Sequence, residues 1–182
     1  MSELVTGVIS GIVASVVFYI FLFFVRPKIY VSSKACRAPE DGTLIRIKVV
    51  NKTRFMLTNV KYALNFCQNQ GDGVHQIKEI PPYRTPLEFI DKYSKNDENA
   101  EYAIRFSYKI PSDISLSDGW LEFSIYANHG FSNTSTCVKK KYVSDDIISG
   151  IFETGTSMKI LAIPKDYQAE PPGQKNRKPG KQ

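Results

Sequence analysis

The chain begins with one long apolar segment and continues with segments in which apolar and polar residues alternate. The run from Leu4 to Val25 contains no charged residue, and Arg26-Pro27-Lys28 follows it directly. At about 1.5 Å per residue, a helix over this run extends roughly 33 Å, which is enough to cross a bilayer once. The pattern predicts a transmembrane anchor over residues 1–27.

A cleaved secretory signal is the alternative interpretation of this segment. Such a signal needs basic residues in front, a shorter apolar core and small residues at the cleavage site. Met1-Ser2-Glu3 contains no Lys or Arg, and Phe23-Phe24-Val25-Arg26 offers no small residues. A buried helix of a soluble protein usually keeps a polar stripe, which this run lacks. We therefore expect an uncleaved anchor.

Behind the anchor the apolar residues recur with a period of two, which is typical of antiparallel strands with one buried face. The four clearest sets are Ile45, Ile47, Val49; Val60, Tyr62, Leu64, Phe66; Tyr102, Ile104, Phe106, Tyr108; and Leu121, Phe123, Ile125. Shorter candidate strands are Lys28 to Ser33, Val74 to Ile80, Leu87 to Ile90 and Thr136 to Val143. The pattern predicts an all-β domain of seven to eight strands over residues 28–163.

The strand spacing indicates two packed sheets or a small barrel, in which the apolar half of every set meets in one core. The charged residues of the alternating segments are then expected outside: Arg46, Lys48, Lys61, Glu101, Arg105 and Glu122.

The run Lys139-Lys140-Lys141 favours an edge strand, where lysine discourages pairing with other chains. Trp120 is expected in the core because of its large apolar area. Ser144 to Gly150 is expected to hold a short helical turn, and the apolar residues after it either a last strand or a lid over the end of the sandwich.

The stretch from Ile45 to Phe66 resembles the B-to-C strand passage of bacterial immunoglobulin-like domains. In those domains one strand ends in Val-x-Asn and the next begins with Asn-Val-x-Val-x-Leu; here Asn51 and Asn59-Val60 occupy these places. The Cys-Trp-Cys order of antibody domains is absent. The resemblance covers about twenty residues and implies an immunoglobulin-like antiparallel sandwich. Such a fold implies binding more often than catalysis, and it names no partner.

The C-terminal segment 164–182 is poor in apolar residues and rich in Pro, Gly, Lys and Arg. Such a composition cannot bury enough surface to order itself, so we expect a flexible basic tail.

The distribution of Lys and Arg predicts the orientation of the anchor, because basic residues are retained on the cytoplasmic side. No basic residue precedes the apolar run, whereas Arg26, Lys28, Lys34 and Arg37 follow it. We expect a single-pass protein of an inner or plasma membrane, with its N-terminus outside and its C-terminal domain in the cytosol. The three cysteines and the net charge of +6 agree with this orientation. Two N-glycosylation triplets, at Asn51 and Asn133, favour the opposite one.

Small residues recur every four positions in the first half of the anchor. Gly7, Gly11 and Ser15 share one helical face, on which a second helix can approach closely. Self-association of the chain through this helix is therefore one hypothesis, and ordinary use of small residues in spanning helices is the other.

Basic residues at the predicted membrane surface favour contact with anionic lipid. Each can contribute on the order of 1 kcal/mol near such a surface. The expected contacts are Arg26 and Lys28 beside the anchor and Lys175, Arg177 and Lys178 in the tail. Binding of single-stranded nucleic acid usually adds aromatic residues between the charges, and the tail has none there. We expect the lipid bilayer as a partner and do not expect nucleic acid.

No catalytic or metal-binding motif stands out. The chain has two histidines, His75 and His129, and neither lies in a nucleophile motif. Cys67 precedes His75 by eight positions and His129 precedes Cys137 by eight, unlike the short ligand spacings of zinc sites. We predict no catalytic residue, no metal and no cofactor.

Two functional hypotheses follow from these observations. The first is a non-enzymatic, membrane-anchored binding module for a protein or small ligand, in its sharper form a sensor or effector subunit of a bacterial membrane system that clusters when it meets its partner. The second is an externally facing envelope-assembly factor or enzyme with a periplasmic sandwich domain.

Overall fold

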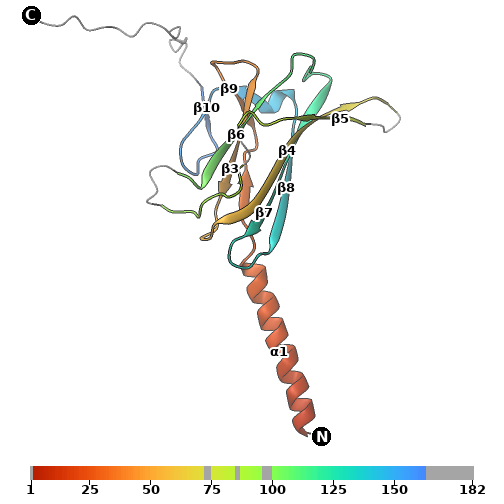
Figure 1. Ribbon diagram of the computed structural model, residues 1–182, viewed down its shortest axis with the longest axis vertical. Coiled ribbons are helices and arrows are strands. Elements are labelled where there is room, and N and C mark those ends of the chain that lie inside the picture. The colour runs from red at the N-terminus through yellow and green to blue at the C-terminus, as the bar shows by residue number, and fades with distance from the viewer. Residues whose placement is uncertain (1, 72–74, 85–86, 96–99, 163–182) are drawn as a thin grey trace, which may run out of the picture.

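The computed structural model describes residues 2–71, 75–84, 87–95 and 100–162, and its chain is mostly β behind one N-terminal helix (Figure 1). The elements, in chain order, are α1 (Ser2–Phe24), β1 (Ile29–Val31), β2 (Ala35–Arg37), β3 (Leu44–Asn51), β4 (Leu57–Asn69), β5 (His75–Ile80), β6 (Ala103–Lys109), β7 (Gly119–His129), β8 (Ser135–Tyr142), the 3-10 turn η1 (Ser144–Asp146), β9 (Ile147–Ser149), β10 (Ile151–Phe152) and β11 (Ile160–Leu161).

The helix α1 contains the candidate membrane span Glu3–Leu22, and no part of that span is buried against the rest of the chain. Figure 1 shows the helix projecting from one end of the β domain. A helix with apolar side chains on all faces has nothing to bury them against within the chain, so it needs an apolar environment from outside.

The strands form two main sheets. In the first sheet β6 pairs antiparallel with one edge of β3, while β1 and β2 pair with successive parts of the other edge. β9 extends this sheet by pairing in parallel with β2. The second sheet is antiparallel and has the order β5-β4-β7-β8. β10 and β11 form a separate two-stranded hairpin.

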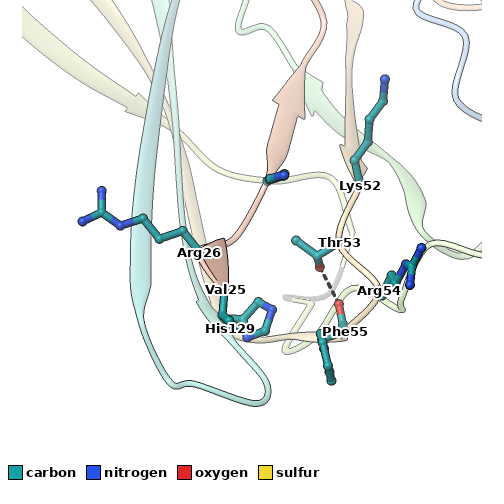
Figure 2. A pocket seen from close by; sticks show the side chains of 8 residues that line it. Val25, Arg26, Lys52, Thr53, Arg54, Phe55 and His129 are labelled. Carbon is teal, nitrogen blue, oxygen red and sulfur yellow. Dashed lines mark hydrogen bonds between the residues drawn. The ribbon is translucent and has the colours of Figure 1, made fainter. Parts of the chain in front are cut away.

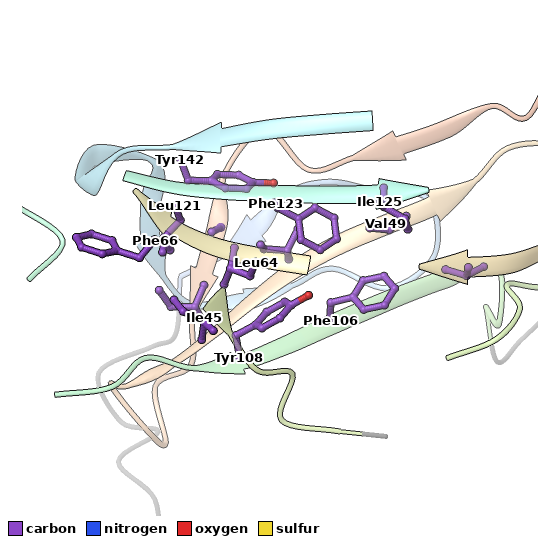
Figure 3. Close-up of a cluster of buried hydrophobic side chains, with 14 of the residues drawn as sticks. Ile45, Val49, Leu64, Phe66, Phe106, Tyr108, Leu121, Phe123, Ile125 and Tyr142 are labelled. Carbon is purple, nitrogen blue, oxygen red and sulfur yellow. The ribbon is translucent and has the colours of Figure 1, made fainter. Parts of the chain in front are cut away.

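Side chains from the two sheets meet in one core (Figure 3). The ring of Phe106 in β6 lies 4.3 Å from that of Tyr62 in β4 and 5.7 Å from that of Phe123 in β7, measured between centroids. Both contacts join one sheet to the other. Buried members of the predicted alternating sets include Ile45, Ile47, Val49, Val60, Leu64, Phe66, Phe106, Tyr108, Leu121, Phe123 and Ile125. The period-two interpretation is confirmed at these positions.

Asn51 and Asn59, the two asparagines of the family resemblance, shape the connection between β3 and β4. Asn51 is fully buried, and its side chain bonds to backbone and hydroxyl groups of the following loop. Asn59 has a φ of 49°, in the left-handed region that asparagine tolerates, where the register between β4 and β7 shifts.

Lys48 corrects the prediction that every alternating charge lies outside. Its side chain is on the outer face of the first sheet, as expected, yet it is only 1% exposed. The chain beside the β10–β11 hairpin covers it, because the Lys48 Nζ donates to the backbone oxygens of Glu153 and Ser157. Alternation shows which face a residue occupies, but it does not show whether a later segment returns to cover that face.

Three further expectations are wrong. The segment expected as a strand at Leu87 to Ile90 is irregular where described, and Ile90 forms one isolated bridge with Leu57. The helical turn expected at Ser144 is present as η1, but it ends at Asp146, and Ile147 and Ile148, expected within it, lie in β9. Trp120 is half-buried outside the core, where the Lys141 Nζ lies 3.9 Å from its ring centroid and the His75 ring meets it edge-on at 5.4 Å.

Lys139-Lys140-Lys141 lies in β8, at the end of the strand order of the second sheet, which confirms the expected edge position. The expected tail, residues 164–182, lies outside the described residues, as does Val74 at the start of the candidate strand Val74 to Ile80.

Candidate membrane-facing site

The junction between α1 and the β domain is built from the last helical turn and the loops at that end of the domain. The backbone oxygens of a final helical turn have no partner within the helix. Here the hydroxyls of Ser132 and Thr134, in the β7–β8 turn, donate to the Val25 oxygen at 3.1 and 3.3 Å. A hairpin more than 100 residues away in sequence therefore satisfies the C-terminal end of the helix and fixes it to the domain.

His129 supports this turn from inside. It is 2% exposed, and its Nδ1 accepts a hydrogen bond from the Ser132 backbone N–H at 3.2 Å. Burial lowers the pKa of His129 below its usual value, so the ring is neutral at pH 7 and Nδ1 is free to accept. His129 thus stabilises the β7–β8 turn, and this turn caps the C-terminal end of α1.

Apolar side chains surround the junction on its outer side. Phe131, at the tip of the β7–β8 turn, is 62% exposed, and Phe55 and Met56, between β3 and β4, are 43% and 41% exposed. Phe131 stacks on Phe55 with ring centroids 5.3 Å apart and meets Phe21 of α1 edge-on at 6.5 Å. Phe21 belongs to the candidate membrane span, so the tip of the turn lies at the same height as the last part of that span.

Four cations lie around the same end. A cavity of about 270 Å³ is lined by Arg26 and Lys28 after the helix, by Lys52 and Arg54 after β3, and by Val25, Thr53, Phe55 and His129. None of the described residues that line it carries a carboxylate. In Figure 2 the side chains of Arg26, Lys52 and Arg54 point in different directions and do not converge on one point. Diverging charges suit an extended anionic surface better than a single small anion.

We name this set the junction surface: Arg26, Lys28, Lys52, Arg54, Phe55, Met56 and Phe131. The sequence predicted Arg26 and Lys28, because they directly follow the apolar run. It missed the other five, which come from two loops that the fold brings to the helix end. An exposed Phe-Met pair behind a basic residue, as in Arg54-Phe55-Met56, is a signal that could have pointed to the first loop.

The predicted helix-packing residues lie on the unburied helix. A side chain added at Gly7 or Gly11 would meet open space, so neither glycine is needed for packing within the chain. The Ser15 hydroxyl donates to the Gly11 oxygen at 2.8 Å, which satisfies it inside the helix. The helix face that Gly7, Gly11 and Ser15 share therefore carries only small side chains, and no described residue packs on its two glycines. Lys175, Arg177 and Lys178 lie outside the described residues.

The two histidines lie at opposite ends of β4. Leu57, at one end of that strand, pairs with His129, whereas Asn69, at the other end, pairs with His75. The strand is 13 residues long, so at about 3.4 Å per residue the two histidines are roughly 40 Å apart. They cannot share a metal ion. No group of three or more His, Cys, Asp or Glu side chains gathers within the described part of the chain.

No protein-family model matches this chain, and no curated protein sequence matches it either.

Proposed function

We propose that the chain is a non-enzymatic, single-pass membrane protein that holds an immunoglobulin-like binding domain against the surface of a bacterial inner membrane. One observation carries the proposal: an apolar helix whose candidate span is not buried by the described residues ends in a surface that combines exposed Phe and Met side chains with four cations. Apolar side chains enter the boundary between headgroups and acyl chains, while Lys and Arg bind anionic headgroups.

The position of Phe131 supports contact with the bilayer beyond the anchor itself. Because its ring touches Phe21 of the candidate span, a helix inserted to that depth carries Phe131 to the lipid boundary. The cations of the junction surface then lie at the headgroups. Positive charge at this end also favours the cytosol for the β domain, since Lys52 and Arg54 add to the basic residues that follow the span.

The immunoglobulin-like assignment is part of the proposal. Two sheets with a common core and the structural roles of Asn51 and Asn59 support it. The partner is a protein or a small ligand, and clustering through the face of Gly7, Gly11 and Ser15 is the way in which binding would act on the membrane.

The test of anchoring and orientation uses the full chain expressed in bacteria. Cys36 and Cys67 are buried and Cys137 is exposed, so a maleimide reports on position 137. We expect the chain to stay in the membrane fraction after alkaline washing. A membrane-impermeant maleimide should label it in broken membranes but not in intact spheroplasts, and Cys137→Ser should abolish the label.

Labelling in intact spheroplasts would refute the cytosolic orientation and support the periplasmic alternative. Recovery of the full-length chain in the soluble fraction without detergent would refute the anchor.

A further inference from the structure

We propose that a second site, beside the edge strand β6, binds a small phosphate-bearing ligand with an attached planar ring, of the nucleotide class. A cavity of about 390 Å³ lies there between β6 and the segment after β10. Its described lining is Lys48, Arg84, Ala100, Ala103, Ile104, Arg105, Thr154 and Gly155, which includes three cations and no carboxylate. The small residues leave room, and the cations supply the donors that a phosphate needs.

Lys48 and Arg105 are direct neighbours across β3 and β6. Like charges at such a position destabilise a sheet, so their pairing calls for an explanation. The covering segment supplies neutral acceptors: the backbone oxygens of Glu153 and Ser157 for Lys48, and that of Phe152 for Arg105 at 3.2 Å. The Glu153 carboxylate accepts from the Ser157 hydroxyl and only partly offsets the two charges. A bound anion would offset them directly.

The third cation, Arg84, approaches from the loop after β5. It is exposed and lines two cavities, and it forms no ion pair or hydrogen bond with another described residue. Its guanidinium is thus available to a ligand at the mouth of the site. Lys48, Arg84 and Arg105 thus border one cavity.

An apolar recess adjoins the cationic cavity. A second cavity of about 210 Å³ shares Arg84, Ile104 and Arg105 with the first and adds Tyr62, Pro82, Leu87, Phe106 and Ser107. Ligand sites combine such apolar walls with a few polar groups that fix orientation. A phosphate at the cations would direct an attached ring toward Tyr62 and Leu87, which is why we infer a nucleotide and not free phosphate.

The test titrates AMP, GMP, CMP and UMP, and separately inorganic phosphate, into the full chain in phosphatidylcholine nanodiscs, followed by calorimetry. We expect saturable binding of at least one nucleotide and much weaker binding of phosphate. Arg84→Ala and Arg105→Ala should each weaken that binding about tenfold or more. Lys61→Ala, which removes an exposed cation from the other sheet, should leave it unchanged.

Arg84 is exposed, so Arg84→Ala should fold normally, and an unchanged thermal midpoint will verify this. No saturation by any nucleotide at millimolar concentration would overturn the proposal, as would equal affinity for phosphate and nucleotide. Nanodiscs with phosphatidylserine form the last arm: if anionic lipid abolishes nucleotide binding in competition, the site takes a lipid headgroup and the nucleotide assignment is wrong. None of these outcomes depends on whether the domain faces the cytosol.

Discussion

Asn51 joins the end of β3 to two loops through one buried side chain. Its amide nitrogen donates to the backbone oxygens of Phe55 and Asp91, at 2.9 and 2.8 Å. Its Oδ1 accepts from the Thr53 backbone N–H and hydroxyl, at 2.8 and 2.6 Å. Both amide hydrogens are therefore used, and the residue is 0% exposed. The folded domain leaves no room for a glycan here, so this triplet no longer argues for an external orientation.

We predict that Asn51→Ala lowers the free energy of unfolding by about 3 kcal/mol, because the buried hydrogen bonds of its side chain to Thr53, Phe55 and Asp91 are lost. Denaturant unfolding of the full chain in detergent measures this. Asn69→Ala, at an exposed position, is the matched control. Equal effects of the two substitutions would show that the buried bonds of Asn51 add nothing.

Lys48 is the second residue whose contacts have a measurable consequence. Burial, followed by the nearby Arg105 charge, lowers the pKa of Lys48 from 10.5 to about 8. Between these two values the unfolded chain still binds the proton and the folded chain has lost it. The contribution of Lys48 to the free energy of unfolding must therefore rise with pH across this window.

We predict that, between about pH 8 and about pH 10.5, the free energy of unfolding of the wild type rises relative to that of Lys48→Met. Below pH 8 the buried charge costs the wild type stability, whereas the variant lacks that charge at every pH. Urea unfolding of both proteins across this range is the measurement, with Lys61→Met as the exposed control. Parallel curves for wild type and Lys48→Met would contradict the prediction.

At the scale of elements, the contacts among the described residues hold α1 near its C-terminal end, and the side chains along the rest of the helix are exposed. The small residues in its first half leave one face flat, and large side chains such as Phe18 and Phe21 lie farther along it. Close helix packing in membranes depends on such flat faces. The junction therefore fixes the direction of the helix while its outer half stays accessible to a second copy.

We predict that Gly11→Leu reduces crosslinked dimers in native membranes severalfold, because a branched side chain keeps the two backbones apart. Crosslinking in membranes that contain the full chain measures the dimer fraction. Val16→Leu is the matched control, since position 16 lies on the opposite side of the helix. A dimer band that stays unchanged in Gly11→Leu would refute packing through this face.

At the scale of the whole molecule, the proposed function has the junction surface hold the β domain against the bilayer by charge and by apolar contact together. The charge part must weaken with salt and with loss of anionic lipid. The two cations on the loop after β3, Lys52 and Arg54, are exposed and can be changed without touching the core.

We predict that Lys52→Glu together with Arg54→Glu lifts the domain from the surface, each lost cation costing on the order of 1 kcal/mol of contact. A Trp placed at Phe131, in a chain with Trp120→Phe, reports the contact through quenching by brominated lipid. Quenching should fall in the double variant and in high salt. Lys61→Glu, on the outer face of the second sheet, should leave it unchanged. Equal quenching in all variants would show that the anchor alone sets the depth of Phe131.

The pattern of apolar and polar residues along the sequence predicted those features of the fold that depend only on residues close together in the sequence. The strand sets around Ile47, Leu64 and Phe123 are confirmed because alternation reflects the geometry of one strand. The segment around Ile90 was misjudged because a short apolar run has the same pattern whether or not a strand lies beside it. Of the candidate site, Arg26 and Lys28 were predictable because they adjoin the span in sequence.

The amino-acid sequence by itself determined the apolar helix and the half-buried strands, since the hydropathy of a segment and its period need no knowledge of other segments. Tertiary structure alone decided the burial of Lys48, which bonds to a segment 105 positions away, and the capping of Val25 by Ser132, 107 positions away. It also decided the gathering of Lys48, Arg84 and Arg105 around one cavity. These features depend on which distant segments meet, and that is settled by the packing of the two sheets as a whole.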